Sequence, residues 1–151
     1  MNTTYGSNNN EFHLGEAKEI IILMGFIKKL FGGTNVAVEE NVLPWINLEE
    51  ENQLEKLEKN SAIKTQLIFK HSTRCGISRM VMNQFVADFD QTANTDIYYL
   101  DVINKRELSR TLASNFQVVH ESPQVLVIKK GVVVAHASHG AINDLDFGRF
   151  I

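Results

Sequence analysis

The sequence predicts an α/β fold in which a mixed four-stranded sheet carries helices on both faces. Two short and mostly apolar segments, residues 65–70 and 97–102, do not alternate at their centres, which is typical of strands buried on both faces. A helical pattern separates them, so they are expected to run parallel, because such a connection requires a long crossover. Segments 124–128 and 132–137 flank a tight turn and therefore predict an antiparallel hairpin.

The first helix is expected to follow Asn47, whose side chain can cap it, with Glu50 closing a capping-box-like pair. Leu54 and Leu57 form the apolar stripe of this helix, which should end near residues 60–61.

The second helix is expected just after strand 65–70. Its apolar residues recur every four positions, at Ile77, Val81, Phe85 and Phe89. After strand 97–102, Asn104 and Glu107 form a second capping-box-like pair. The third helix carries its apolar face on Leu108, Leu112 and Phe116.

The last part of the chain contains the hairpin, whose first strand is introduced by Pro123 and whose tight turn is Lys130-Gly131. Ser138 is then expected to cap a final helix that runs through Ile142 and Leu145.

Length and composition exclude several classes of protein. The chain has 151 residues, 44% of them hydrophobic, which suits one ordinary domain, and its net charge of −3 leaves no basic excess for binding nucleic acid. The single cysteine excludes an intramolecular disulfide and favours the reducing cytoplasm. The longest apolar run, residues 20–27, is too short to cross a bilayer, so no transmembrane segment is expected.

Residues 1–40 are expected to form an N-terminal tail, and residues 41–151 the compact domain. The first ten residues are polar and rich in asparagine, which is typical of disorder. Residues 16–31 can form a short amphipathic helix. Three interpretations of that helix stay open: loose packing on the domain, a weak interfacial membrane anchor, or a translation start at Met24 that makes the preceding residues irrelevant.

Cys75 is the strongest candidate for a reactive group. It lies where a buried strand ends and a helix begins, and the unpaired amides of a helix N-terminus stabilise an anion. The thiolate is the nucleophilic form of cysteine. The neighbouring Arg74 adds a positive charge, and the residues around the cysteine are polar, unlike the surroundings of a structural core cysteine.

These features together resemble the thioredoxin fold, and within it the monothiol bacilliredoxins, which are also described as bacillithiol-system or general stress proteins. The resemblance covers roughly residues 41–151. Four segments carry it: Phe69-Lys70-His71-Ser72-Thr73-Arg74-Cys75, Tyr99-Leu100-Asp101-Val102, His120-Glu121-Ser122-Pro123-Gln124 and Ala137-Ser138-His139. The family usually has Thr-Cys-Pro-Ile-Ser around the thiol, whereas Arg74 and Gly76 stand here in place of the threonine and the proline. The glycine makes the first helical turn less rigid.

The resemblance assigns roles to the residues around the thiol. Ser78 stands where a dithiol thioredoxin has its resolving cysteine, so a mixed disulfide on Cys75 must be resolved by an outside thiol. The Ser78 hydroxyl could donate to the Cys75 thiolate, or Ser78 could be a simple first-turn residue. Pro123 is expected to be a cis proline beside the cysteine, and the backbone of Ser122 to pair with an extended substrate. Arg74 is expected to help bind the substrate.

His71 lies four residues before Cys75 and is a possible neighbour of the thiol, although its position favours a structural role. The histidines do not form a metal-binding pattern, so no metal site is expected. No tightly bound cofactor is expected either; the resemblance implies bacillithiol, or another low-molecular-weight thiol, as co-substrate.

The predicted function is that of a monothiol thiol–disulfide oxidoreductase that removes a small thiol from thiolated client proteins through Cys75. Two alternatives stay open. Cys75-Gly76-Ile77-Ser78 is similar to the Cys-Gly-Phe-Ser motif of monothiol glutaredoxins, some of which carry an iron–sulfur cluster, but a glycine pair after the hairpin is missing. The other alternative is a non-catalytic stress or interaction protein of the same fold.

Overall fold

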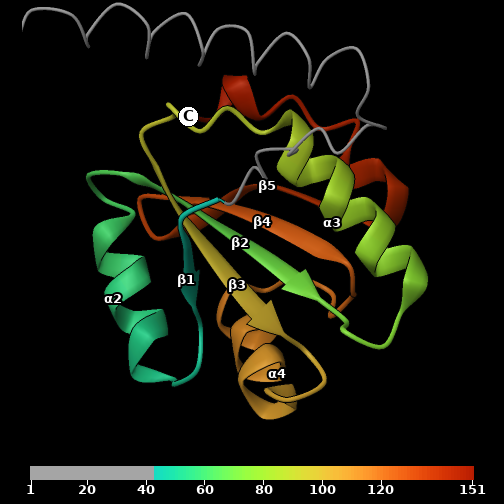
Figure 1. Ribbon diagram of the computed structural model, residues 1–151. Coiled ribbons are helices and arrows are strands. Elements are labelled where there is room, and N and C mark those ends of the chain that lie inside the picture. The colour runs from blue at the N-terminus through green and yellow to red at the C-terminus, as the bar shows by residue number, and fades with distance from the viewer. Residues whose placement is uncertain (1–42) are drawn as a thin grey trace, which may run out of the picture. The chain divides into compact units, whose positions relative to one another are not determined.

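The structure of the protein is a computed structural model that describes residues 43–151 (Figure 1). The expectations for residues 1–40, namely the disordered tip, the helix over 16–31 and the alternative start at Met24, lie outside the described residues. The boundary between residues 40 and 41 therefore stays a prediction.

Five strands form one mixed sheet in the order β1-β3-β2-β4-β5. They span Trp45–Asn47 (β1), Thr65–His71 (β2), Thr95–Asp101 (β3), Gln124–Lys129 (β4) and Val132–Ser138 (β5). β3 runs parallel to both β1 and β2, whereas β4 runs antiparallel to β2 and β5 antiparallel to β4. The predicted parallel pair and C-terminal hairpin are confirmed, and the sheet has one strand more than predicted.

The hairpin turn between β4 and β5 has the predicted residues and a geometry that explains them. Lys130 and Gly131 have φ angles of 52° and 78°, both in the left-handed region. Two consecutive left-handed residues form a turn whose twist matches that of the flanking strands, and glycine adopts this conformation without a steric penalty.

The additional strand β1 replaces the start that was predicted for the first helix. Asn47 pairs with Tyr99 in the sheet and is not a helix cap, so that prediction is wrong. β1 has only three residues, too few to show the alternation by which a strand is detected. α2 (Asn52–Asn60) begins five residues later, and no side chain caps its first residue.

Gln53 organises the turn that joins β1 to α2. Its side-chain oxygen accepts hydrogen bonds from the backbone N–H groups of Glu49 and Glu50, at 2.7 and 2.9 Å. Its side-chain nitrogen donates to the carbonyl oxygen of Asn47, at 2.9 Å. One amide side chain thus supplies the local contacts that the predicted capping pair was expected to supply.

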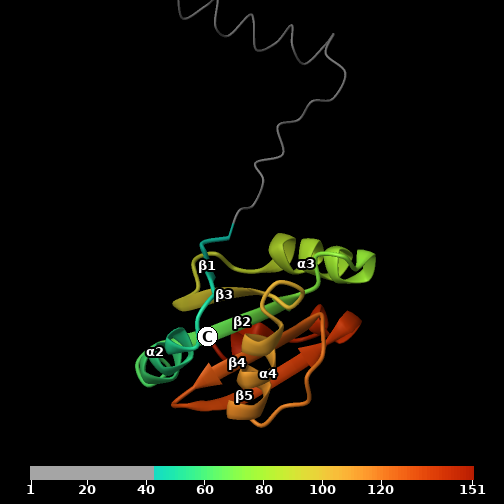
Figure 2. The same cartoon turned by 90° about the horizontal axis from the view of Figure 1, so that it is seen from below.

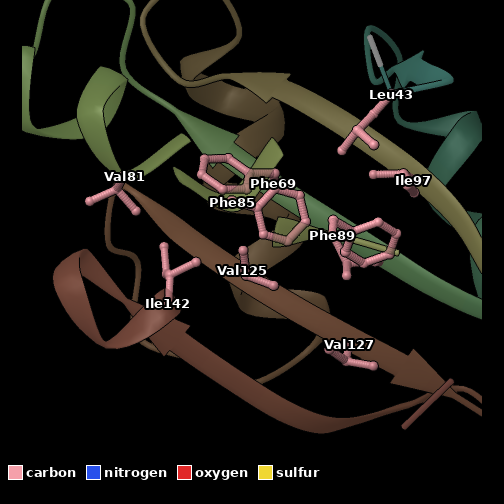
Figure 3. Packing of buried hydrophobic residues seen from close by; sticks show 10 residues of the cluster. Leu43, Phe69, Val81, Phe85, Phe89, Ile97, Val125, Val127 and Ile142 are labelled. Atoms are coloured by element: carbon pink, nitrogen blue, oxygen red, sulfur yellow. The ribbon is translucent and has the colours of Figure 1, made fainter. Parts of the chain in front are cut away.

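Helices cover both faces of the sheet, as predicted (Figures 1 and 2). α3 (Gly76–Asp88) lies over the face that presents Leu67 and Phe69 of β2, whereas α2 and α4 (Arg106–Asn115) cover the face that presents Ile68. The two faces follow from the alternation of side chains along β2. Figure 3 shows the packing under α3, where aromatic rings from the helix meet β2.

The start of α4 also differs from the prediction. Lys105 is the residue before the helix, and no side-chain hydrogen bond caps it. The side-chain nitrogen of Asn104 donates to Asp101 at 2.7 Å, and Glu107 pairs with Arg110 at 2.9 Å. Asn104 and Glu107 therefore stabilise neighbouring turns and do not form a capping box.

The predicted last helix is absent from residues 138–151, which contain two 3₁₀ turns, η1 (His139–Ile142) and η2 (Phe147–Arg149). Ser138, expected as the cap, is the last residue of β5. His139 has a φ of 55°, in the left-handed region, which an α-helix does not contain, and a 3₁₀ turn of four residues stands where the helix was predicted to begin. Ile142 is nevertheless completely buried.

Phe85 provides the clearest test of the core under α3, because its ring lies 5.1 Å from the rings of both Phe69 and Phe89 and 5.3 Å from that of Phe147. We expect Phe85→Ala to lower the free energy of unfolding by about 3–5 kcal/mol, because it removes a buried ring and leaves a cavity. Urea unfolding measures this change. Met80→Ala, on the exposed side of the same helix, should change it by about 0.5 kcal/mol or less; equal losses would contradict the packing described.

Candidate active site

The turn between β2 and α3 presents the thiol of Cys75. The backbone N–H of Cys75 donates to the carbonyl of Ser72 at 3.1 Å, which closes the turn, and the Cys75 carbonyl accepts the N–H of Arg79 at 3.1 Å, which starts the helix. Cys75 is thus the residue that precedes α3, as predicted. It is half-buried, so part of the residue is accessible to a reactant.

The first turn of α3 has a composition that favours an anion. It contains no acidic residue, and its backbone N–H groups point away from the helix toward the residue that precedes it. A thiolate at this position therefore interacts with the positive end of the helix dipole and with no opposing carboxylate from the same turn.

Ser78 faces the interior of the protein from the first turn of α3 and is completely buried. Its hydroxyl oxygen accepts the backbone N–H of Ser72 at 3.0 Å and lies 2.8 Å from Nδ1 of His71. No hydrogen bond between Ser78 and Cys75 occurs in the described part of the chain. Ser78 therefore connects the first turn of α3 to the end of β2 through hydrogen bonds, and in this way stabilises the turn that carries Cys75.

The tautomer of His71 decides where the Ser78 proton points. If Nδ1 is unprotonated, the Ser78 hydroxyl donates to it; if Nδ1 carries the proton, it donates to Ser78 and leaves the hydroxyl proton free for another acceptor. The second arrangement allows Ser78 to donate to a nearby anion. His71 thus contacts the active-site turn through Ser78 and not through the sulfur.

Burial lowers the pKa of His71, and the positive charge of Arg79 acts in the same direction, whereas the negative charge of Asp101 and a hydrogen bond from the imidazole to the backbone of Ser78 oppose it. Only 7% of the residue is exposed, and its ring packs 5.9 Å from that of Tyr99. The imidazole is therefore neutral at neutral pH and acts as a hydrogen-bonding group, without a positive charge.

The Ser122–Pro123 bond is cis, as the resemblance implied. Gln124, the first residue of β4, pairs with Lys70 near the end of β2. Because the two strands are antiparallel, the segment before β4 and the segment after β2 lie at the same edge of the sheet. Pro123 and the Cys75 turn are therefore brought to one edge.

Ser122 differs from its neighbours in having no hydrogen-bond partner. Its hydroxyl oxygen is buried without one, and no described hydrogen bond uses its backbone N–H or carbonyl. The carbonyl of Pro123, in contrast, accepts the N–H of His139 at 2.9 Å. The unpaired backbone of Ser122 has the property required of a residue that pairs with an added strand.

The structure places Arg74 on the surface and turns one predicted core position outward. Arg74 is exposed and takes part in none of the ion pairs described for residues 43–151. Ile77, expected on the apolar stripe, is 59% exposed. The inward positions of α3 are Ser78, Val81 and Phe85, a spacing of three and four residues that turns Ile77 outward.

Sequence reasoning missed two buried polar residues at this edge. Lys70 and Gln124 are both completely buried, and the Lys70 ammonium donates to the Gln124 side-chain oxygen at 2.8 Å. The available signal was a lysine within a segment that the sequence predicts to be buried on both faces. A charged side chain at such a position requires a polar partner on a neighbouring strand.

Within residues 43–151, no group of three or more histidine, cysteine, aspartate or glutamate side chains is arranged to hold a metal ion. In the same residues, no helix has the length and apolar character required to cross a membrane.

We expect acid to destabilise the wild type more than the variant His71→Gln. The unfolded histidine, with its ordinary pKa of 6.5, takes up a proton more readily than the folded one. The contribution of neutral His71 is therefore complete above that value and is lost as the pH falls below it. Urea unfolding at about pH 7.5 and about pH 5 measures the difference. Burial lowers the pKa of His120 too, but that residue is common to both proteins. If both proteins lose the same free energy of unfolding between the two pH values, the prediction is contradicted.

The chain is similar to one protein family and to several solved structures. Residues 46–147 match the family described as "Monothiol bacilliredoxin BrxC". A solved structure described as a thioredoxin-fold protein and candidate oxidoreductase is 33% identical, covering 70% of this chain and 91% of the other, with a TM-score of 0.61.

Solved thioredoxins share the fold at lower identity. That of Schistosoma mansoni is 19% identical, covers 71% of this chain and 95% of its own, and has a TM-score of 0.54. That of Fasciola hepatica is 20% identical, covers 70% and 98%, and has a TM-score of 0.56. The protein has a thioredoxin-like fold and a thiol redox role, and the chain belongs to the monothiol bacilliredoxin family.

Proposed function

We propose that the protein removes a low-molecular-weight thiol, bacillithiol, from mixed disulfides on client proteins, with Cys75 as the nucleophile. The observation that carries the proposal is the position of the sole cysteine of the chain, half-buried directly before α3, with a serine three residues later. A chain with one thiol can accept a small thiol but cannot release it by forming its own disulfide.

The reaction proceeds in two exchanges. The Cys75 thiolate attacks the small-thiol sulfur of the client's mixed disulfide, a new disulfide forms between Cys75 and the small thiol, and the client leaves as a thiolate that takes up a proton. A second small thiol, as thiolate, then attacks the same small-thiol sulfur. It forms the symmetrical small disulfide and returns the Cys75 thiolate.

The site offers two features to a protein client. The unpaired backbone of Ser122 is suited to pair with an extended segment that carries the modified cysteine. Ile77 and Met80 lie one helical turn apart on α3 and are 59% and 66% exposed. An apolar surface next to the nucleophile favours a polypeptide over a small polar molecule alone.

The choice of bacillithiol rests on the family and on Arg74. Bacillithiol carries a malate group with two carboxylates, and the exposed Arg74 guanidinium, adjacent to Cys75 and without an ion-pair partner among the described residues, is suited to bind a carboxylate. Because the second exchange consumes a reduced small thiol, the proposal also places the protein in the reducing cytoplasm.

Intact mass spectrometry tests this proposal. The reduced protein is incubated with bacillithiol disulfide, glutathione disulfide or coenzyme A disulfide, one at a time. We expect an adduct of one bacillithiol on Cys75 to form fastest. Adducts that form equally fast with all three would contradict the choice of small thiol. No adduct with any of them would contradict the exchange function and favour a non-catalytic role.

We expect Cys75→Ser to abolish removal of bacillithiol from a modified client. Its free energy of unfolding, measured in urea, should stay within about 0.5 kcal/mol of that of the wild type. Serine has nearly the same shape, and residue 75 is half-buried with polar neighbours. Release of the client thiol, followed with a thiol reagent, measures the activity. Thr73→Ser, in the same turn, serves as the control and should retain activity. Activity that survives in Cys75→Ser would contradict the mechanism.

We expect Ser78→Cys to convert the protein into a dithiol exchanger. Residues 75 and 78 are three positions apart across the start of α3, so we expect the new thiol to lie within disulfide reach of Cys75. After one equivalent of bacillithiol disulfide, the wild type should retain its adduct. The variant should lose the adduct and become about two mass units lighter than its reduced form. An equally stable adduct in the variant would show that the two side chains do not meet.

A further inference from the structure

We propose that the buried side chain of Lys70 is a positioning residue that holds the segment 119–123 in the shape required to bind the protein client. The inference rests on the proposed function. It assigns Lys70 to recognition of the client polypeptide and not to the reaction of the thiol.

Lys70 lies in the sheet, between β3 and β4, and none of its surface is exposed. Its position in β2 turns the side chain toward the face that α2 and α4 cover, opposite to that of His71 and α3. The one hydrogen bond described for its ammonium is that to the Gln124 side-chain oxygen. A buried ammonium with few partners is costly in free energy, so it is not explained by stability alone.

Gln124 transmits this contact to the segment before the cis proline. It is completely buried, and its side-chain nitrogen donates to the carbonyl of Val119 at 2.9 Å. Its side-chain oxygen, which accepts from Lys70, also lies 3.4 Å from the backbone N–H of Glu121. One amide group therefore contacts the segment on both sides of His120, and Lys70 orients that amide by donating to its oxygen.

Three other contacts hold the remaining residues of the segment. His120 Nε2 lies 2.9 Å from the Ser109 hydroxyl of α4, and the carboxylate of Glu121 accepts the hydroxyl of Ser138. The Pro123 carbonyl accepts the N–H of His139. Within the segment 119–123, Ser122 is the one residue without a described hydrogen-bond partner. The contacts thus restrain every neighbour of Ser122 and leave its backbone available to a client.

The charge of Lys70 is matched to these surroundings. Burial lowers its pKa to about 8, and the negative charge of Glu121 opposes this change. The amine is therefore still mostly protonated at neutral pH, and a charged donor makes a stronger hydrogen bond to an amide oxygen than a neutral one.

The test compares two substrates in the full-length protein. The first is a client protein with bacillithiol on one cysteine, which must bind through its polypeptide. The second is bacillithiol disulfide, which has no polypeptide to dock. In Lys70→Met, which keeps the length of the side chain and removes its donor, we expect kcat/KM for the client to fall about tenfold or more, mainly through KM. The rate of adduct formation with the disulfide should stay within about twofold.

Lys59→Met, an exposed lysine on α2, is the matched control and should leave both rates unchanged. Gln124→Leu should reproduce the selective loss, and combining it with Lys70→Met should add little, because both changes interrupt the same contact. Amide hydrogen exchange of Glu121, whose N–H faces the Gln124 side-chain oxygen, should be faster in each single variant than in the wild type, which measures the restraint directly and independently of activity.

The outcomes separate the two proposals. If the wild type reacts with neither substrate, the proposed function fails. If the wild type reacts with both, but Lys70→Met and Gln124→Leu slow both reactions equally or leave client turnover unchanged, the positioning role is overturned. Unchanged hydrogen exchange of the Glu121 amide would also overturn it, provided that urea unfolding shows each variant to be folded.

Discussion

The antiparallel pairing of β2 with β4 is the constraint on which the active site depends. β2 ends at His71 and leads into the turn that carries Cys75, whereas β4 begins at Gln124 directly after the cis Ser122–Pro123 bond. Antiparallel neighbours place the end of one strand beside the start of the other. The proposed nucleophile and the segment proposed to bind the client are thus held by the same pair of strands, about fifty residues apart in the chain.

Two adjacent residues of β2 connect this edge to opposite sides of the sheet. The His71 side chain lies on the α3 side and reaches Ser78, so it stabilises the turn of the nucleophile. The Lys70 side chain lies on the other side and reaches Gln124, so it supports the segment before the cis proline. Both residues are buried, and burial lowers the pKa of each. Because side chains alternate along one strand, the residue that supports the Cys75 turn and the residue that supports the segment proposed to bind the client lie on opposite faces of the sheet.

Much of the architecture could be predicted from the sequence because it depends on local patterns. The apolar segments around Ile68 and Leu100 identify buried strands, and the residues Lys130-Gly131 identify the hairpin turn. Cys75 is placed before a helix because the continuous apolar pattern of a buried strand gives way there to the four-residue spacing of a helix. β1 and the 3₁₀ turn at Ile142 could not be assigned in this way, because three or four residues are too few to establish a period.

The sequence by itself determined the single thiol at the junction of a strand and a helix, the serine three residues later and the proline before the last hairpin. Tertiary structure decided what these residues contact. Ser78 binds His71 and the Ser72 backbone, Lys70 finds its only described partner on a strand that begins 54 residues later, and Ser122 is left unpaired among restrained neighbours. The physical reason is that hydrogen-bond partners across a sheet are set by strand order and register, which depend on the packing of the whole domain and not on the residues next to each position.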